Sequence, residues 1–103
     1  MVEGIDVDHR IRDGLPVGGF TRSTGIDIRW QDGVVEGRPN GASVETVIFA
    51  AVSRLLFFQE AVDGRFACDH NAKAIALLTQ AIDALEERTR EREERGVEGT
   101  YAP

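Results

Sequence analysis

The feature that most constrains the fold is a long run, Asp69 to Arg95, that contains neither proline nor glycine. Apolar residues recur in it at steps of three and four, at Ala72, Ile75, Leu78, Ile82 and Leu85. This spacing is typical of one face of an amphipathic helix, and on a helical wheel it covers an arc of about 160°. Gly96 follows directly and suits a helix C-terminus. We therefore predict one helix over residues 68–95.

Two arginines near the end of this run share the phase of its apolar face. On the wheel Arg92 lies about 20° and Arg88 about 60° from Leu85, whereas Arg90 points the other way. Arginines are also common at helix ends because they suit the negative end of the helix dipole. That plainer interpretation does not explain the shared phase, so both residues are candidates for ligand binding. Asn71 falls in the same arc at the other end of the helix.

Composition excludes several functions. Acidic side chains outnumber basic ones by 18 to 12, and the formal net charge is −6. This balance argues against broad binding to DNA, RNA or an anionic membrane, but it allows a small anion held by a few arginines. The single cysteine permits no internal disulfide, which favours a reducing compartment. Without an apolar run of membrane-spanning length or a signal-peptide pattern at the start, we expect a cytosolic protein.

The remaining segments predict an α+β fold within a single domain, residues 1–103. Residues 1–25 are expected to be a variable segment, in which the glycines and proline at 14–19 read as a loop. Residues 26–37 predict a β-hairpin, because an alternating apolar and polar run is followed by a DG turn signal and a VV pair. Residues 43–61 predict a first helix, and 96–103 form a non-helical tail.

The connection between the two predicted helices is short, so they should form an antiparallel hairpin. The expected architecture is a small N-terminal antiparallel β-hairpin or sheet packed on this helical hairpin. A chain of 103 residues buries a modest core. We therefore expect oligomers.

The sequence shows no catalytic constellation. Cys68 and His70 are near each other, but residues two apart on a helix face different ways. His9 with Cys68 and His70 lacks a fourth zinc ligand at a recognisable spacing. Lys73 is the only lysine, and no phosphate-binding glycine loop precedes it. The sequence therefore favours a binding protein without enzymatic activity, metal or cofactor.

Four residues have properties that suit a nucleotide ligand. Phe58 can stack on a base, Asn71 can pair with a base edge, and two arginines, Arg88 and Arg92, can hold phosphates. The plainer interpretation of Phe58 is a core residue. At the helical rise, Asn71 and Arg88 lie roughly 25 Å apart, too far for one nucleotide within one chain. A ligand touching both ends would lie between antiparallel subunits.

A series of short motifs runs from residue 40 to the tail. They are NG at 40–41, RLLFFQ at 54–59, FAC at 66–68 with NA at 71–72, RTR at 88–90 and RGVEGT at 95–100. They resemble the small phage proteins of the first Thoeris anti-defence family, and the resemblance covers about residues 26–101. The FAC and RGVEGT motifs are the most specific, and residues 1–25 fall outside the resemblance.

The resemblance implies a phage protein that sequesters cyclic ADP-ribose isomers made by bacterial TIR-domain enzymes, without cleaving them, in the cytoplasm of the infected host. It implies dimers and higher assemblies, up to a hexamer, with ligand sites between subunits, and some members hold cyclic oligonucleotides at a separate site. The implied ligand contacts are Phe58 for stacking, Asn71 for polar contact, Arg88 and Arg92 for the diphosphate, and, as weaker candidates, Arg38 and Thr100.

One departure and two alternatives qualify this reading. Other members often carry Arg-Glu before the asparagine, whereas this chain has Asp69 and His70, which changes the charge beside the site. A nucleotide-signal hydrolase is disfavoured by the missing catalytic residues. A protein-interaction module would dock an acidic partner on the basic helix end and would bind no nucleotide.

Overall fold

A computed structural model describes residues 4–103 and contains three strands followed by two helices. The strands are β1 (Asp6–Arg12), β2 (Leu15–Ser23) and β3 (Ile26–Arg29), and the helices are α1 (Val44–Gly64) and α2 (Asp69–Glu94). They fall into two compact units. The sheet unit runs up to Ser43 and includes the tail Gly96–Pro103, and the helical unit is Val44–Arg95. The predicted α+β class is confirmed.

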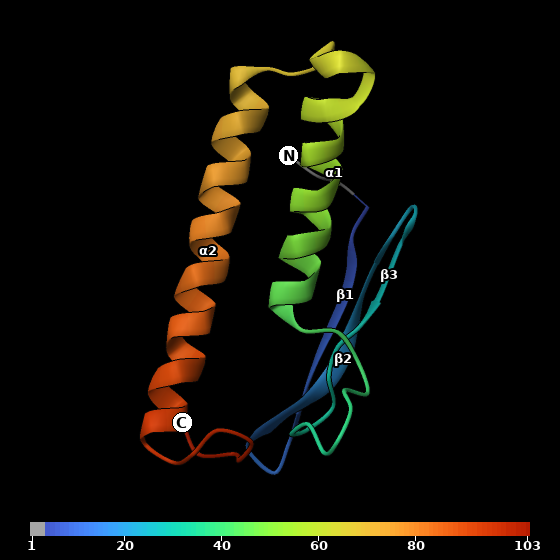
Figure 1. The fold of residues 1–103 in the computed structure, drawn as a ribbon. Coiled ribbons are helices and arrows are strands. Elements are labelled where there is room, and N and C mark those ends of the chain that lie inside the picture. The colour runs from blue at the N-terminus through green and yellow to red at the C-terminus, as the bar shows by residue number, and fades with distance from the viewer. Residues whose placement is uncertain (1–3) are drawn as a thin grey trace. The chain divides into compact units, whose positions relative to one another are not determined.

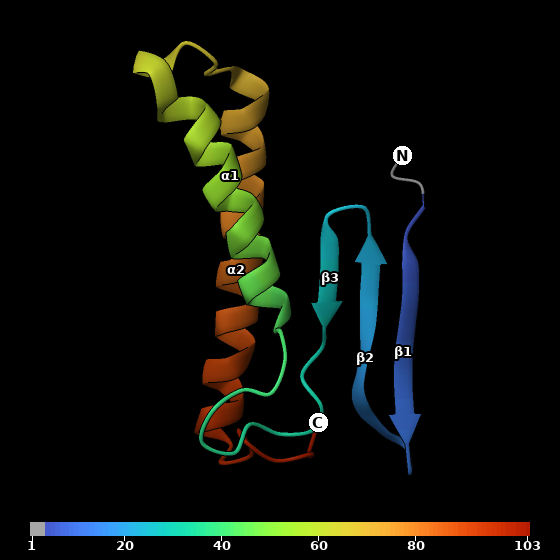
Figure 2. The ribbon, with the colours of Figure 1, turned by 90° about the vertical axis from the view of Figure 1, so that its right-hand side faces the viewer.

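The sheet unit is built on antiparallel strands in the order β1-β2-β3 (Figure 2). Two-residue turns join them, because Arg12 pairs with Leu15 and Ser23 pairs with Ile26. The second residue of each turn is a glycine with φ of 76°, a conformation that glycine adopts without steric cost. The turn residues therefore fix which strands are neighbours.

The predicted β-hairpin over residues 26–37 is wrong. Ile26–Arg29 does form a strand, but it pairs with the preceding strand β2 and not with residues 34–35. The sequence hid β2 because Pro16, Gly18 and Gly19 read as a loop. At Gly19 a Cβ would collide with the carbonyl oxygen of Asp8 on β1. This glycine permits a close approach of two strands.

Residues 1–25, expected to be a variable segment, therefore supply two of the three strands of the sheet. Residues 1–3 of that segment lie outside the described part of the chain. After β3, residues 30–42 form a loop. A bridge between Val17 and Asp32 ties this loop back to β2, and a bridge between Trp30 and Ala42 joins its two ends. The tail reaches the same loop, since a Cβ at Gly33 would lie 2.7 Å from the Tyr101 hydroxyl.

The helical unit is an antiparallel hairpin in which α1 and α2 pack side by side (Figure 1). Regular helical geometry in α1 ends before Ala61, where ψ is 148°, and Val62 and Asp63 then adopt left-handed conformations with φ of 54° and 56°. The N-cap of α2 is Cys68, whose Sγ accepts the Asn71 N–H at 3.4 Å. These bounds lie close to the predicted ranges 43–61 and 68–95.

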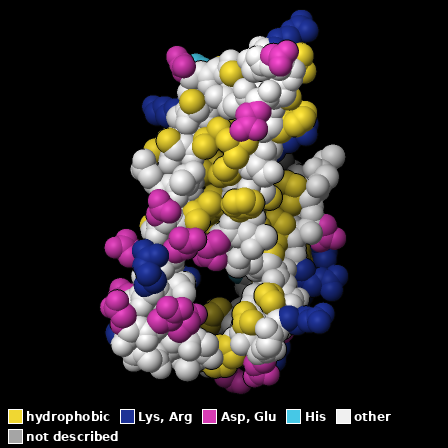
Figure 3. All heavy atoms as spheres, in the orientation of Figure 1, with side chains coloured by type: hydrophobic (Ala, Val, Ile, Leu, Met, Phe, Trp, Pro, Cys, Tyr) yellow, Lys and Arg dark blue, Asp and Glu magenta, His cyan; other side chains and the backbone are white. Residues whose placement is uncertain are grey.

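The hydrophobic core of the described residues is thin. Val52, 6% exposed, is the one buried hydrophobic residue within residues 4–103, and none of these residues is fully buried. Large apolar side chains stay exposed on the helices, such as Phe49 at 65% and Leu77 at 55%. Figure 3 shows hydrophobic side chains at the surface of the helical unit and charged ones gathered towards the C-terminal end of α2. Apolar surface of this kind is typical of proteins that associate.

Over residues 4–103, neither helix combines the length and the apolar character needed to cross a membrane.

Candidate ligand-binding site

Phe58 and Asn71 are linked at the turn end of the helical hairpin. Gln59, next to Phe58, pairs with the backbone of Cys68: its Oε1 accepts the Cys68 N–H at 2.8 Å, and its Nε2 donates to the Cys68 carbonyl at 3.2 Å. The Sγ of Cys68 in turn accepts the N–H of Asn71. This chain of hydrogen bonds holds the end of α1 against the start of α2.

Phe58 belongs to an aromatic pair that an arginine covers. The Phe57 and Phe58 rings lie edge to face with centroids 5.6 Å apart. The guanidinium carbon of Arg54 lies 4.7 Å from the Phe57 centroid and 5.0 Å from that of Phe58, within the range of a cation–π contact. Sequence reasoning missed Arg54, although its spacing of four residues before Phe58 places both on one helix face.

Arg88 and Arg92 lie towards the opposite end of α2. The helix runs unbroken from Asp69 to Glu94, so Asn71 and Arg88 are roughly 25 Å apart along its axis. Arg88 is exposed and Arg92 is half-buried. Within the helical unit of one chain, the two arginines are therefore not brought together with Phe58 and Asn71.

The two weaker candidates belong to the sheet unit. Arg38 lines a cavity of about 370 Å³ together with Glu36 and, from the tail, Tyr101. Thr100 shapes the tail itself, because its hydroxyl donates to the carbonyl of Val97 and accepts the N–H of Ala102. The structure thus brings Arg38 to the tail, and it gives Thr100 a local structural role.

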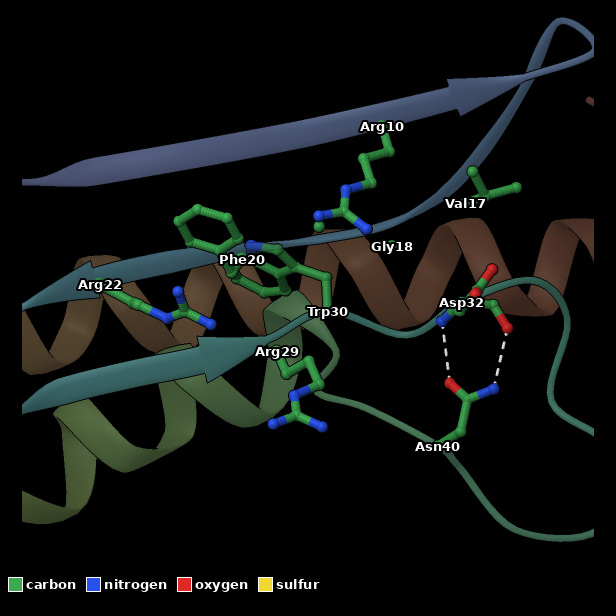
Figure 4. A pocket seen from close by; sticks show the side chains of 10 residues that line it. Arg10, Val17, Gly18, Phe20, Arg22, Arg29, Trp30, Asp32 and Asn40 are labelled. Carbon is green, nitrogen blue, oxygen red and sulfur yellow. Dashed lines mark hydrogen bonds between the residues drawn. The ribbon is translucent and has the colours of Figure 1, made fainter.

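A larger cavity of about 430 Å³ opens on the sheet unit (Figure 4) and was not anticipated from the sequence. Its charged and aromatic lining comes from all three strands and the following loop, and includes Arg10, Arg22, Arg29, Phe20, Trp30 and Asp32. Strand pairing gathers them, because the register sets Phe20 opposite Arg29. Because the sequence pattern did not predict β2, it did not predict that these side chains lie together.

The guanidinium groups of this cavity differ in their partners. Arg10 pairs with Asp8 at 2.6 Å, and Arg22 pairs with Asp27 at 3.1 Å. Arg29 makes no ion pair with any residue from 4 to 103. The Trp30 indole is fixed by donating to the Thr21 hydroxyl at 3.0 Å. Exposed ion pairs contribute little stability, so Arg10 and Arg22 can exchange their carboxylate partners for a bound anion.

Among the described residues, no group of three histidine, cysteine, aspartate or glutamate side chains is placed to hold a metal ion. Cys68 is an exposed free thiol that is engaged as a helix cap. The surfaces described above are therefore suited to recognising a ligand by stacking, hydrogen bonds and charge.

Comparison with known proteins identifies the family. No protein-family model matches the chain. A curated protein of Bacillus phage SBSphiJ7, Thoeris anti-defense 1, is 44% identical to it over 68 residues. The chain belongs to the Thoeris anti-defence family. The match covers 66% of this chain and 46% of that relative, so this chain spans less than half of the length of the phage protein. The resemblance seen in the motifs of this Thoeris anti-defence protein is confirmed.

Proposed function

We propose that this protein is a phage anti-defence protein that binds a cyclic ADP-ribose-type immune signal and sequesters it in the cytoplasm of the infected bacterium. The observation that carries the proposal is the 44% identity to Thoeris anti-defense 1. Sequestration requires tight binding and no bond cleavage, so it needs no catalytic group. The helical hairpin carries side chains suited to binding. They can stack, form hydrogen bonds and hold phosphates: Phe58, Asn71, Arg88 and Arg92.

The proposed ligand site lies between two subunits. Asn71 and Arg88 are separated by roughly 25 Å along one rigid helix, which exceeds the reach of one nucleotide-sized ligand. Antiparallel pairing of two copies brings Phe58 and Asn71 of one chain to Arg88 and Arg92 of the other. The exposed apolar side chains of the helices, such as Phe49 at 65%, provide surface for this association.

Each residue has a distinct role in the proposed site. The base stacks on the aromatic cluster at Phe58, and the Asn71 amide pairs with its edge. The guanidinium groups of Arg88 and Arg92 hold the diphosphate through charge-assisted hydrogen bonds. Binding therefore depends on both ends of the hairpin.

The proposal extends to cyclic oligonucleotides, which the family resemblance implies for a separate site. The cavity of about 430 Å³ on the sheet unit is the candidate, because Arg10, Arg22 and Arg29 line it beside Phe20 and Trp30. Three guanidinium groups suit phosphates, and aromatic rings suit bases.

The first test is a thermal-shift screen with cyclic ADP-ribose isomers and with cyclic di- and trinucleotides. A ligand that binds only the folded protein raises its melting temperature by mass action. We expect one cyclic ADP-ribose isomer to raise it, and heat denaturation of the complex to release that isomer intact. Recovery of a cleaved ligand would indicate a hydrolase, and a flat panel would favour a protein-interaction module.

The second test removes the charges that hold the diphosphate. Arg88→Ala and Arg92→Ala should each weaken binding of the isomer at least tenfold, because one charge-assisted contact is lost, while circular dichroism stays unchanged. Arg90→Ala is the matched control, since Arg90 is also exposed on α2 but points away from Arg88 and Arg92 on the helical wheel. Unchanged affinity in both variants would remove these arginines from the site.

A further inference from the structure

Arg54 covers one side of the aromatic pair formed by Phe57 and Phe58 near the end of α1. The Arg54 guanidinium sits over Phe57 and Phe58 together, with its carbon 4.7 and 5.0 Å from the two centroids. A guanidinium is planar and has two faces. Arg54 is exposed, so its guanidinium is open to a ligand on the side away from the rings. A ligand approaching from this side meets the cation before the rings.

The charge of Arg54 is not neutralised locally. It makes no ion pair with any residue from 4 to 103. Its neighbours on the same helix face are Ala50 and Ala51 on one side and the two phenylalanines on the other. The chain has 18 acidic side chains, yet none of those described pairs with Arg54. The result is an exposed cation beside exposed rings, since Phe57 is 52% and Phe58 37% exposed.

The cluster stands on a fixed support. Gln59 follows Phe58 and is held by two hydrogen bonds to the Cys68 backbone, at 2.8 and 3.2 Å. The cap between Cys68 and Asn71 continues this support into α2. Arg54, the two rings and Asn71 are therefore presented at one end of the hairpin, with the support made before any ligand binds.

We propose that Arg54 is a further ligand-contacting residue, whose open face stacks on the base of the bound signal to form a ring–guanidinium–base stack. This inference rests on the proposed function and deepens it. Arginine planes stack on bases and their N–H edges donate to base acceptors. Arg54 therefore distinguishes phosphates that carry a flat base from phosphates without one, a distinction that Arg88 and Arg92 do not make.

The experiment compares three variants by isothermal titration. Arg54→Gln removes the plane and the charge, and Arg54→Lys keeps the charge without the plane. The matched control is Arg65→Gln, because Arg65 also lies over a phenylalanine, 5.5 Å from the centroid of Phe66, and its loss changes the net charge equally. The ligands are the cyclic ADP-ribose isomers, ADP, and inorganic pyrophosphate, which has no base.

We expect Arg54→Gln to weaken binding of the base-bearing ligands at least tenfold and to change pyrophosphate binding less than twofold. Arg54→Lys should lie between Arg54→Gln and wild type, and Arg65→Gln should match wild type. An Arg54 that merely shields the rings would lower the melting temperature without this split between ligands. Equal affinity of Arg54→Gln and wild type for the base-bearing ligands, with binding lost in Arg88→Ala, would overturn this inference alone. No binding by wild type would overturn the proposed function with it.

Discussion

Gly19 shows how one residue can decide the pairing of two strands. Its φ of 117° lies in a region that side-chain-bearing residues rarely adopt. A Cβ at this position would also collide with the backbone of Asp8 on β1. Gly37 has a positive φ of 81° as well, but the space around it is open. Substitution of Gly37 therefore measures the free-energy cost of the backbone conformation alone, and substitution of Gly19 measures that cost together with the steric clash.

We predict that Gly19→Ala lowers the free energy of unfolding of the sheet unit by more than about 3 kcal/mol, because strain and clash add. Gly37→Ala, the control, should cost only about 1–2 kcal/mol from its conformation. Urea unfolding followed by the fluorescence of Trp30, the only tryptophan, reports on this unit. Similar stability of the two variants would contradict the close approach of β1 and β2.

The connection between α1 and α2 is the element that positions the candidate site. Val62 and Asp63 adopt left-handed conformations with φ of 54° and 56°, which is unfavourable for a β-branched residue such as Val62. Such conformations persist where the surroundings enforce them. The two hydrogen bonds between Gln59 and Cys68 span this turn, which also contains a backbone hydrogen bond from the Arg65 N–H to the Val62 carbonyl.

We predict that Gln59→Leu lowers the stability of the helical unit by about 1–2 kcal/mol, because two hydrogen bonds are replaced by bonds to water at an exposed site. The loss should appear as an earlier urea midpoint in helical circular dichroism. Gln80→Leu is the control, since Gln80 is exposed in the middle of α2. A midpoint equal to that of the control would show that the turn forms without this clamp.

At the scale of the whole molecule, the exposed apolar surface points to association. Within residues 4–103 the one buried hydrophobic residue is Val52, which is a small core for a chain of this length. Phe49 on α1 is 65% exposed, and contact between a large apolar side chain and water is unfavourable. Burying such a side chain in an interface contributes about 1.5–3 kcal/mol.

We predict that wild type elutes as a dimer or larger species in size-exclusion chromatography with light scattering at micromolar concentration. Phe49→Asp should shift this population towards monomer, because it places a charge in the apolar contact. Ala51→Asp introduces the same charge on an exposed small residue of α1 that points about 160° away from Phe49 on the helical wheel, and it should leave the assembly intact. A monomeric wild type would refute the site between subunits.

The sequence alone determined the helical hairpin and the residues at its two ends. Helical periodicity is local, so the spacing of Ile75, Leu78 and Ile82 was enough to indicate α2. The family motifs then gave Phe58, Asn71, Arg88 and Arg92 roles that stay predictions. Local rules also placed the turn between the helices, which ends at Cys68, the N-cap of α2.

Only the tertiary structure decided the sheet and its cavity. Strand pairing depends on residues distant in sequence, so Gly18 and Gly19 read as a loop until β1 was placed beside them. The cluster of Arg10, Arg22 and Arg29 exists because three strands pair side by side in one sheet. The same holds for Gln59, whose partner lies across a turn. The physical reason is that helical periodicity depends on residues close together in the sequence, whereas the close approach of two segments depends on residues far apart in it.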